Sequence, residues 1–222
     1  PRETLATVLF ADSGGTRLFE KYGAQRGRQI ETRVLDVLTT RIDAQGGVLV
    51  KAAGDEIMSC FPDPERAVRA ACEMQRGLKD DSALIGLNIS VKIGLHHGQV
   101  LVEEDKVFGD AVNVAVRMFT LAKADQIITT QETAGLLPAD LGQMARDLGQ
   151  SWVPGKQGEM EITEIIWRDS TSQTQVVIYQ EALMKLLFAR LFLEYRGKSI
   201  ELMPDHRVFK IGRGAGNDLV VS

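Results

Sequence analysis

The sequence lacks any apolar run approaching the roughly 18 residues that a membrane-spanning helix needs, and no signal peptide opens it. It has only two cysteines, Cys60 and Cys72, and two thiols in a reducing compartment explain them better than a disulfide does. Basic residues do not predominate, since 26 Lys and Arg stand against 30 Asp and Glu, for a net charge of −4. These absences argue against a membrane protein, a secreted disulfide scaffold and an electrostatic nucleic-acid binder. They favour a cytoplasmic location.

The composition that remains is ordinary for a globular protein, with 44% apolar and 25% charged residues. At 222 residues the chain could hold one large domain, or one medium domain and a fragment. It begins with Pro1 rather than with Met, so we expect a piece of a longer protein.

Hydrophobic periodicity divides the first part of the chain into strands and helices. We expect a strand over 5–11, a helix from near Thr16, a long helix ending at Gly46–Gly47, a hairpin over 48–61 and a helix from Asp63–Pro64 to about Leu78. Further along we expect strand residues over 89–95, a turn at Gly98 into a strand over 99–103, a helix over 110–122, a strand over 126–129 and a hairpin over 143–167. This order predicts an α+β fold, with helices packed on a mainly antiparallel sheet.

The composition changes after Arg168. Residues 169–175 (DSTSQTQ) are polar and aperiodic, and strand-like segments follow them. We therefore expect one domain over 1–168, a linker over 169–185 and a short β-rich C-terminal fragment over 186–222. Because about 40 residues cannot bury a useful core alone, the tail should dock on the first domain or on a partner.

Two acidic residues, Asp12 and Asp55, lie where strand-like segments run into tight turns, in VLFAD (8–12) and VLVKAAGDEIMSCF (48–61). If the two strands pair, the carboxylates meet and can hold a pair of hard cations. Metal ions about 3.5–4 Å apart stabilise the attacking and leaving oxygens of in-line phosphoryl transfer. The alternative is that each Asp is a turn residue, a place that Asp favours anyway.

The turn after Asp12 contains Ser13, Gly14, Gly15 and Thr16 and leads into a helix. Backbone N–H groups at the start of a helix can cradle a polyphosphate. Glycine-rich turns between strands and helices are common, so this feature alone is weak.

Asn113 and Arg117 are spaced i, i+4 on a helix whose other residues are mostly apolar. A nucleotide's ribose and α-phosphate would give them partners, because Arg suits charge on phosphorus and Asn can orient a sugar oxygen. A structural ion pair or a solvated face is the alternative. Lys51, at the exit of a strand, could donate to a purine or be an ordinary strand-end charge.

In this order and spacing, VLFADSGGTRLFE, VKAAGDEIMSCFPDPERAVRAA, IGLHHGQV and VFGDAVNVAVRM resemble signatures of the class III adenylyl/guanylyl cyclase catalytic domain. The resemblance spans roughly residues 3–168. It implies a ferredoxin-like, polymerase-palm-like antiparallel sheet and a two-fold homodimer with two shared active sites. It also implies conversion of ATP to 3′,5′-cyclic AMP and pyrophosphate with two Mg²⁺ or Mn²⁺ ions per site.

The resemblance assigns roles residue by residue. One subunit would supply Asp12 and Asp55 for the metals. The other would supply Lys51 for the base, Asn113 and Arg117 for the transition state, and Lys156 (in VPGKQG) for the outer phosphates. His96 and His97 are interpreted as structural.

The sequence departs from the family pattern at two points. The metal loop is one residue short, so either Ser13 supplies the metal-binding backbone carbonyl from an altered turn or the sequence lacks a residue there. Lys106 stands where adenylyl cyclases carry Asp or Thr, and its ammonium cannot accept from an adenine amino group, although Asp105 next to it could. Lys51 fits the adenine-type residue, which favours ATP over GTP. The open alternatives are a guanylate cyclase, or a cyclase-like regulatory module that binds nucleotide without turnover.

The tail resembles the opening strands of a forkhead-associated domain, a phosphothreonine-binding module. Arg213, in KIGRGAGNDLVV, matches the phosphate-contacting arginine of that family. This resemblance implies a phosphothreonine protein partner for the full-length module, whose later segments are absent here. An ordinary β-hairpin with an exposed arginine is the alternative.

Overall fold

The computed structural model of the chain describes residues 2–104, 106–152, 159–168, 191–195, 198–202, 211–212 and 219–220. The chain divides into two compact units, Pro1–Trp167 and Arg168–Ser222. In the second unit, β9 (Leu191–Tyr195) pairs with β10 (Lys198–Leu202) antiparallel, and β11 (Ile211–Gly212) pairs with β12 (Leu219–Val220) parallel.

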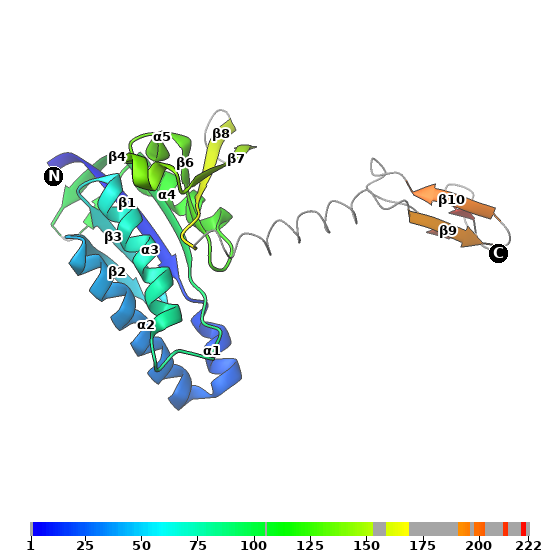
Figure 1. Cartoon of the computed structure of the whole chain (residues 1–222), viewed down its shortest axis with the longest axis horizontal. Coiled ribbons are helices and arrows are strands. Elements are labelled where there is room, and N and C mark those ends of the chain that lie inside the picture. Colours follow the sequence, from blue (N-terminus) through cyan, green and yellow to red (C-terminus); the bar gives the residue numbers. More distant parts are fainter. Residues whose placement is uncertain are drawn as a thin grey trace. The chain divides into compact units, whose positions relative to one another are not determined.

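The first unit is built on one sheet whose strands run in the order β2-β3-β1-β4-β6-β8-β7, with β5 paired to β4 (Figure 1). Its strands are β1 (Arg2–Asp12), β2 (Val48–Ala53), β3 (Glu56–Phe61), β4 (Lys92–Glu103), β5 (Lys106–Phe108), β6 (Ile127–Thr130), β7 (Ala145–Trp152) and β8 (Glu159–Ile165). Its helices are α1 (Gly15–Tyr22), α2 (Ala24–Ala44), α3 (Pro64–Asp80), α4 (Asp110–Leu121), α5 (Gln131–Ala134) and α6 (Ala139–Gly142). Apart from the parallel β4–β6 pair, the pairings are antiparallel, as predicted.

The long helix α2 ends, and α3 begins, where the sequence predicts. In α2 the residues spaced four apart, Ile30, Val34, Leu38 and Ile42, are all buried. The helix ends where Gly46 adopts φ +67°, a conformation that suits glycine. The α3 helix starts at the predicted cap, where the Asp63 carboxylate accepts from the Arg66 N–H at 2.9 Å.

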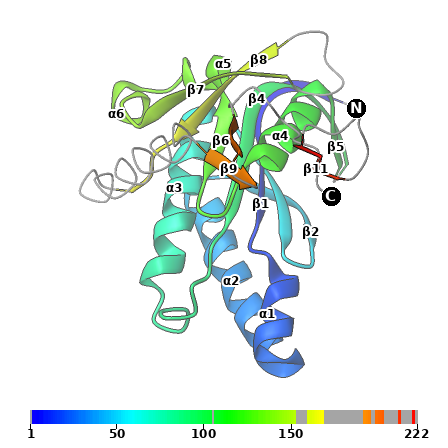
Figure 2. The same cartoon turned by 90° about the vertical axis from the view of Figure 1, so that its right-hand side faces the viewer.

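The helices cover the sheet from both faces (Figure 2). On one face, α2 and α3 bury the main core, with Leu9, Ile57 and Ile93 of three neighbouring strands beneath them. On the other face, α4 packs Ala111, Ala115 and Phe119 over the alternate strand residues, among them Val8, Phe10 and Met58. The period of two along β1 therefore divides its side chains between two cores, and the α+β fold is confirmed.

The predicted turn at Gly98 is wrong, because β4 runs without a break and pairs Gly98 with Ala6 of β1. The glycine marks a close approach instead. A Cβ added there would lie 3.2 Å from the Cβ of Ala111 on α4. The strand also starts later than predicted, since Ile89 and Val91 are buried but precede it.

Gly94, four residues earlier on β4, makes an even closer approach. A Cβ at this position would overlap the backbone nitrogen and Cα of Phe119. Gly94→Ala should therefore push α4 off the sheet and lower the free energy of unfolding by at least about 2 kcal/mol. Gly142→Ala is the control, since nothing lies within 4 Å of the added Cβ. Urea denaturation of both variants would test this, and equal stabilities would contradict the close-packing argument.

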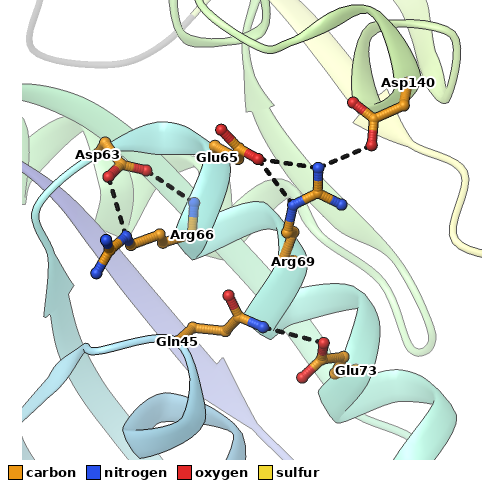
Figure 3. A network of polar contacts seen from close by, with 7 residues as sticks. All are labelled: Gln45, Asp63, Glu65, Arg66, Arg69, Glu73 and Asp140. Carbon is orange, nitrogen blue, oxygen red and sulfur yellow. Dashed lines mark hydrogen bonds and ion pairs between the residues drawn. The ribbon is translucent and has the colours of Figure 1, made fainter.

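Charged side chains on the outer side of α3 form a surface network (Figure 3). Arg69 pairs with Glu65 on the same helix and with Asp140 on α6, at 2.9 and 2.8 Å. Exposed pairs of this kind contribute little to stability. Arg69 is therefore a convenient position for control variants.

Both cysteines are free thiols, as predicted. Burial raises the pKa of Cys60 and that of Cys72 to about 11, so both stay protonated at neutral pH. Among the residues that the structure describes, no helix is both long and apolar enough to cross a lipid bilayer.

Candidate active site

The carboxyl groups of Asp12 and Asp55 come together at one end of the sheet. Antiparallel pairing places Asp12, the last residue of β1, opposite Glu56, and Asp55 precedes Glu56 in the β2–β3 turn. Burial raises the pKa of Asp12 above its ordinary value, and the hydrogen bond and negative charge of Asp55 raise it further. The Gly14 N–H and the Lys92 ammonium act in the opposite direction. Two carboxyls in such contact would gain from a cation between them.

Lys92 is a site residue that the sequence reasoning missed. It is the first residue of β4, directly opposite Asp12 in the strand register, and its Nζ lies 3.5 Å from Asp12 Oδ2. The same ammonium lies over the ring of Phe119 on α4, 4.1 Å from its centroid. The sequence feature that could have indicated it is a single lysine at the start of the apolar strand segment KIGL.

The turn after Asp12 wraps back on the aspartate. Gly14 has φ +68°, and its N–H donates to Asp12 Oδ1 at 2.7 Å. The α1 helix starts at Gly15 without a side-chain cap and with no acidic residue in its first turn. The N-terminus of α1 therefore lies next to the carboxylate pair, and Asp12 already accepts from one of its N–H groups. The phosphate cradle expected here stays a prediction. Thr16 lies in that first turn.

A cleft of about 490 Å³ opens beside Asp12. Its walls come from the turn after β1, from α1, from the segment before β4 and from the segment after α4. The lining residues are Asp12, Ser13, Gly14, Leu18, Lys21, Tyr22, Leu87, Asn88, Ile89, Ser90, Lys92, Ala122, Lys123 and Ala124. The three lysines give this wall a positive balance against one carboxylate, which suits a polyanion.

The residues expected from the second subunit lie apart from this cleft. Asn113 on α4, Lys51 on β2 and Lys106 on β5 are exposed. Arg117 is half-buried, and its Nη1 is buried without a hydrogen-bond partner in the described part of the chain. None of these four lines the cleft. Asp105, Lys156 and Arg213 lie outside the described residues. The resemblance of the tail to a phosphothreonine-binding module, and the partner it implies, stay predictions.

His96 and His97 are held by threonines, which agrees with a structural role. His96 is buried, and its Nδ1 lies 2.9 Å from Thr130 Oγ1 and 3.1 Å from Thr133 Oγ1. His97 Nδ1 lies 2.9 Å from Thr7 Oγ1. Neither imidazole lines the cleft.

The residues present fit a hard divalent cation. Within the described ranges, no group of three or more His, Cys, Asp or Glu side chains could hold a metal ion, so the chain offers a carboxylate pair. Mg²⁺ is commonly bound by one or two carboxylates together with substrate phosphates and water. Ser13 is 9% exposed, and its hydroxyl is buried without a hydrogen-bond partner among the described residues. This oxygen is therefore available as a further ligand in the turn.

Comparison with known proteins places this chain in a family. The model of the adenylate and guanylate cyclase catalytic domain matches residues 2–166. An uncharacterised Mycobacterium tuberculosis protein is 33% identical over 132 residues, which cover 59% of this chain and 34% of that protein. An adenylate cyclase of Anabaena cylindrica is 35% identical over 136 residues, covering 53% of this chain and 27% of that protein.

A solved structure supports the same fold. Adenylate cyclases of Trypanosoma brucei in their monomeric state superpose with a TM-score of 0.67 at 16% identity, over 72% of this chain and 87% of that chain. The chain spans a third or less of the length of these curated relatives, 34% and 27%. Since the family model covers well over half of the chain, this chain belongs to the adenylate and guanylate cyclase catalytic domain family.

Proposed function

We propose that this chain is an adenylate cyclase that converts ATP to 3′,5′-cyclic AMP and pyrophosphate. The observation that carries the proposal is the contact between the Asp12 and Asp55 carboxyls, beside a cationic cleft and a helix N-terminus. The reaction needs carboxylates that bind metal ions and a positively charged surface that binds the triphosphate. Both lie at this end of the sheet.

Asp12 and Asp55 would hold two Mg²⁺ or Mn²⁺ ions, and Ser13 would add a backbone carbonyl. When bound, such ions lower the pKa of the ribose 3′-hydroxyl and neutralise charge on the phosphates. Lys92 and the N–H groups of the first turn of α1, from Gly15 on, would bind phosphate oxygens. Lys92 would exchange its pairing with Asp12 for the triphosphate, because an ammonium cannot satisfy both fully.

The second half of the site would come from another copy of the chain. Asn113 and Arg117 project from α4 outside the cleft, and the buried Nη1 of Arg117 needs an acceptor. Phe108 beside Lys106 and Val116 beside Arg117 are 46% and 40% exposed, which supports a partner surface at these positions. In a homodimer, Asn113 would orient the ribose and Arg117 would stabilise charge on the α-phosphate.

ATP is the proposed nucleotide. The Anabaena relative is named an adenylate cyclase, and Lys51 is exposed on β2, where it could donate to a purine ring nitrogen. Lys106 has no acceptor for an adenine amino group, so it would bind a ring nitrogen or a phosphate.

The test is direct. The full chain with ATP and Mn²⁺ should release cyclic AMP and pyrophosphate in equal amounts, and GTP should be turned over more slowly. Faster turnover of GTP would make the chain a guanylate cyclase. Tight ATP binding with no cyclic product under Mg²⁺ or Mn²⁺ would overturn catalysis and leave a nucleotide-binding module.

A further inference from the structure

The chain leaves its first unit from a residue that is held at two points. Trp167, the last residue of that unit, is 7% exposed. Its indole N–H donates to the Asp125 carbonyl at 2.7 Å, and its own carbonyl accepts from Arg76 Nη2 at 3.0 Å. The connection to the second unit therefore begins at a fixed residue.

The turn that Trp167 holds is strained. Asp125 has φ +65°, a left-handed conformation that a residue with a Cβ keeps only where its surroundings hold it. Its N–H donates to the Val91 carbonyl at 2.9 Å, and its carboxylate pairs with Lys79 Nζ at 3.0 Å. Trp167 and Lys79 thus fix Asp125 from two different elements.

Lys79 also holds the segment on the other side of this turn. Its Nζ donates to the Ile89 carbonyl at 2.8 Å, and Gln75, one turn earlier on α3, donates to the Val91 carbonyl at 3.0 Å. The Lys79 ammonium therefore contacts both segment 89–92 and the Asp125 turn, and Trp167 contacts the same turn through the Asp125 carbonyl.

Both joined segments are walls of the cleft beside Asp12. Ile89, Ser90 and Lys92 line one wall, and residues 122–124, directly before Asp125, line the other. Lys92 reaches Asp12 from the end of the first segment. A shift of either segment would change the width of the cleft, and a shift of segment 89–92 would also move the Lys92 ammonium.

We propose that Lys79 and Trp167 are positioning residues for the nucleotide. They clamp the Asp125 turn to segment 89–92 and so set the shape of the triphosphate cleft, although neither lines it. The proposal rests on the proposed function of the cleft.

The first test uses the full chain and 3′-deoxy-ATP with Mg²⁺, since this nucleotide lacks the attacking hydroxyl. Lys79→Met should raise the dissociation constant measured by calorimetry about tenfold, the scale seen when residues that orient direct ligands are removed. Lys79→Arg should recover part of the loss. Arg69→Met, which breaks an exposed pair on the same helix, should bind as tightly as the wild type. In turnover with ATP, Lys79→Met should raise KM and leave kcat nearly unchanged.

The second test uses Trp167 as a reporter. With Trp152→Phe, Trp167 is the only tryptophan in the chain, and its emission should change when 3′-deoxy-ATP and Mg²⁺ are added. Unchanged emission, together with wild-type affinity in both Lys79→Met and Trp167→Phe, would overturn the clamp and leave the proposed function standing. Failure of the wild type to bind this nucleotide at all would instead overturn the proposed function.

Discussion

Asp55→Asn should abolish cyclic nucleotide formation and, in the absence of metal, make the protein more stable. The activity should fall at least about a thousandfold, because a metal ion supplies several kcal/mol of transition-state stabilisation and about 4 kcal/mol corresponds to that factor. Glu56→Gln is the matched control, since it removes the neighbouring exposed carboxylate and should retain most of the activity. A fully active Asp55→Asn enzyme would rule out the carboxylate pair as the metal site.

The gain in stability follows from the raised pKa of Asp12. A carboxyl whose pKa is higher in the folded than in the unfolded chain favours folding when protonated. That contribution is lost as the pH rises from the ordinary value of 3.8 through the folded pKa. At neutral pH the ionised Asp12 carboxylate therefore lowers the free energy of unfolding of the metal-free protein. Asp55→Asn removes the neighbouring negative charge and should restore up to about 1 kcal/mol, the scale for like charges that face each other on neighbouring strands.

Urea denaturation at several pH values, with a chelator present, measures this difference. The wild type should lose more stability than Asp55→Asn as the pH rises above the acidic range. Adding Mn²⁺ should reverse the order, because an ion that binds only the folded state stabilises it by mass action. A variant that is less stable than the wild type without metal would show that Asp55 has a structural role instead.

The sequence predicted the layers of the fold because its signals were local. Apolar spacing, the Asp63–Pro64 start and the glycine stop at residues 46–47 each act within one element, and the structure keeps them all. The approach of Asp12 to Asp55 was also within reach. Two strands that both end in acidic turns leave few registers that bury their apolar residues.

What the sequence could not supply depends on contacts between distant elements. A glycine at position 98 is compatible with a turn and with a strand residue that allows a helix to pack closely. Only the position of α4 against β4 decides between these two roles. Lys92 becomes a site residue because β4 lies beside β1 in a register that places it opposite Asp12. The contact between Trp167 and Asp125 joins residues 42 apart, and no local pattern marks it.

Mixing Asp55→Asn chains with Arg117→Ala chains should restore activity that neither variant has alone. If each active site takes its carboxylates from one subunit and Arg117 from the other, a heterodimer of the two variants has one intact site and one doubly defective site. Random pairing of equal amounts in a two-fold dimer then gives about a quarter of the wild-type activity. Cyclic AMP release should rise as the chains exchange partners.

The single-chain geometry makes this outcome a sharp test. Arg117 does not line the cleft that contains Asp12, and its Nη1 has no hydrogen-bond partner within the described residues. Mixing Asp55→Asn with Asp12→Asn is the control, because both changes fall in the same half-site and no pairing restores it. Activity in that control, or none in the Asp55→Asn and Arg117→Ala mixture, would mean that the site is not shared. If the mixture alone recovers, Arg117 acts across the interface on a nucleotide held by the carboxylates of the partner.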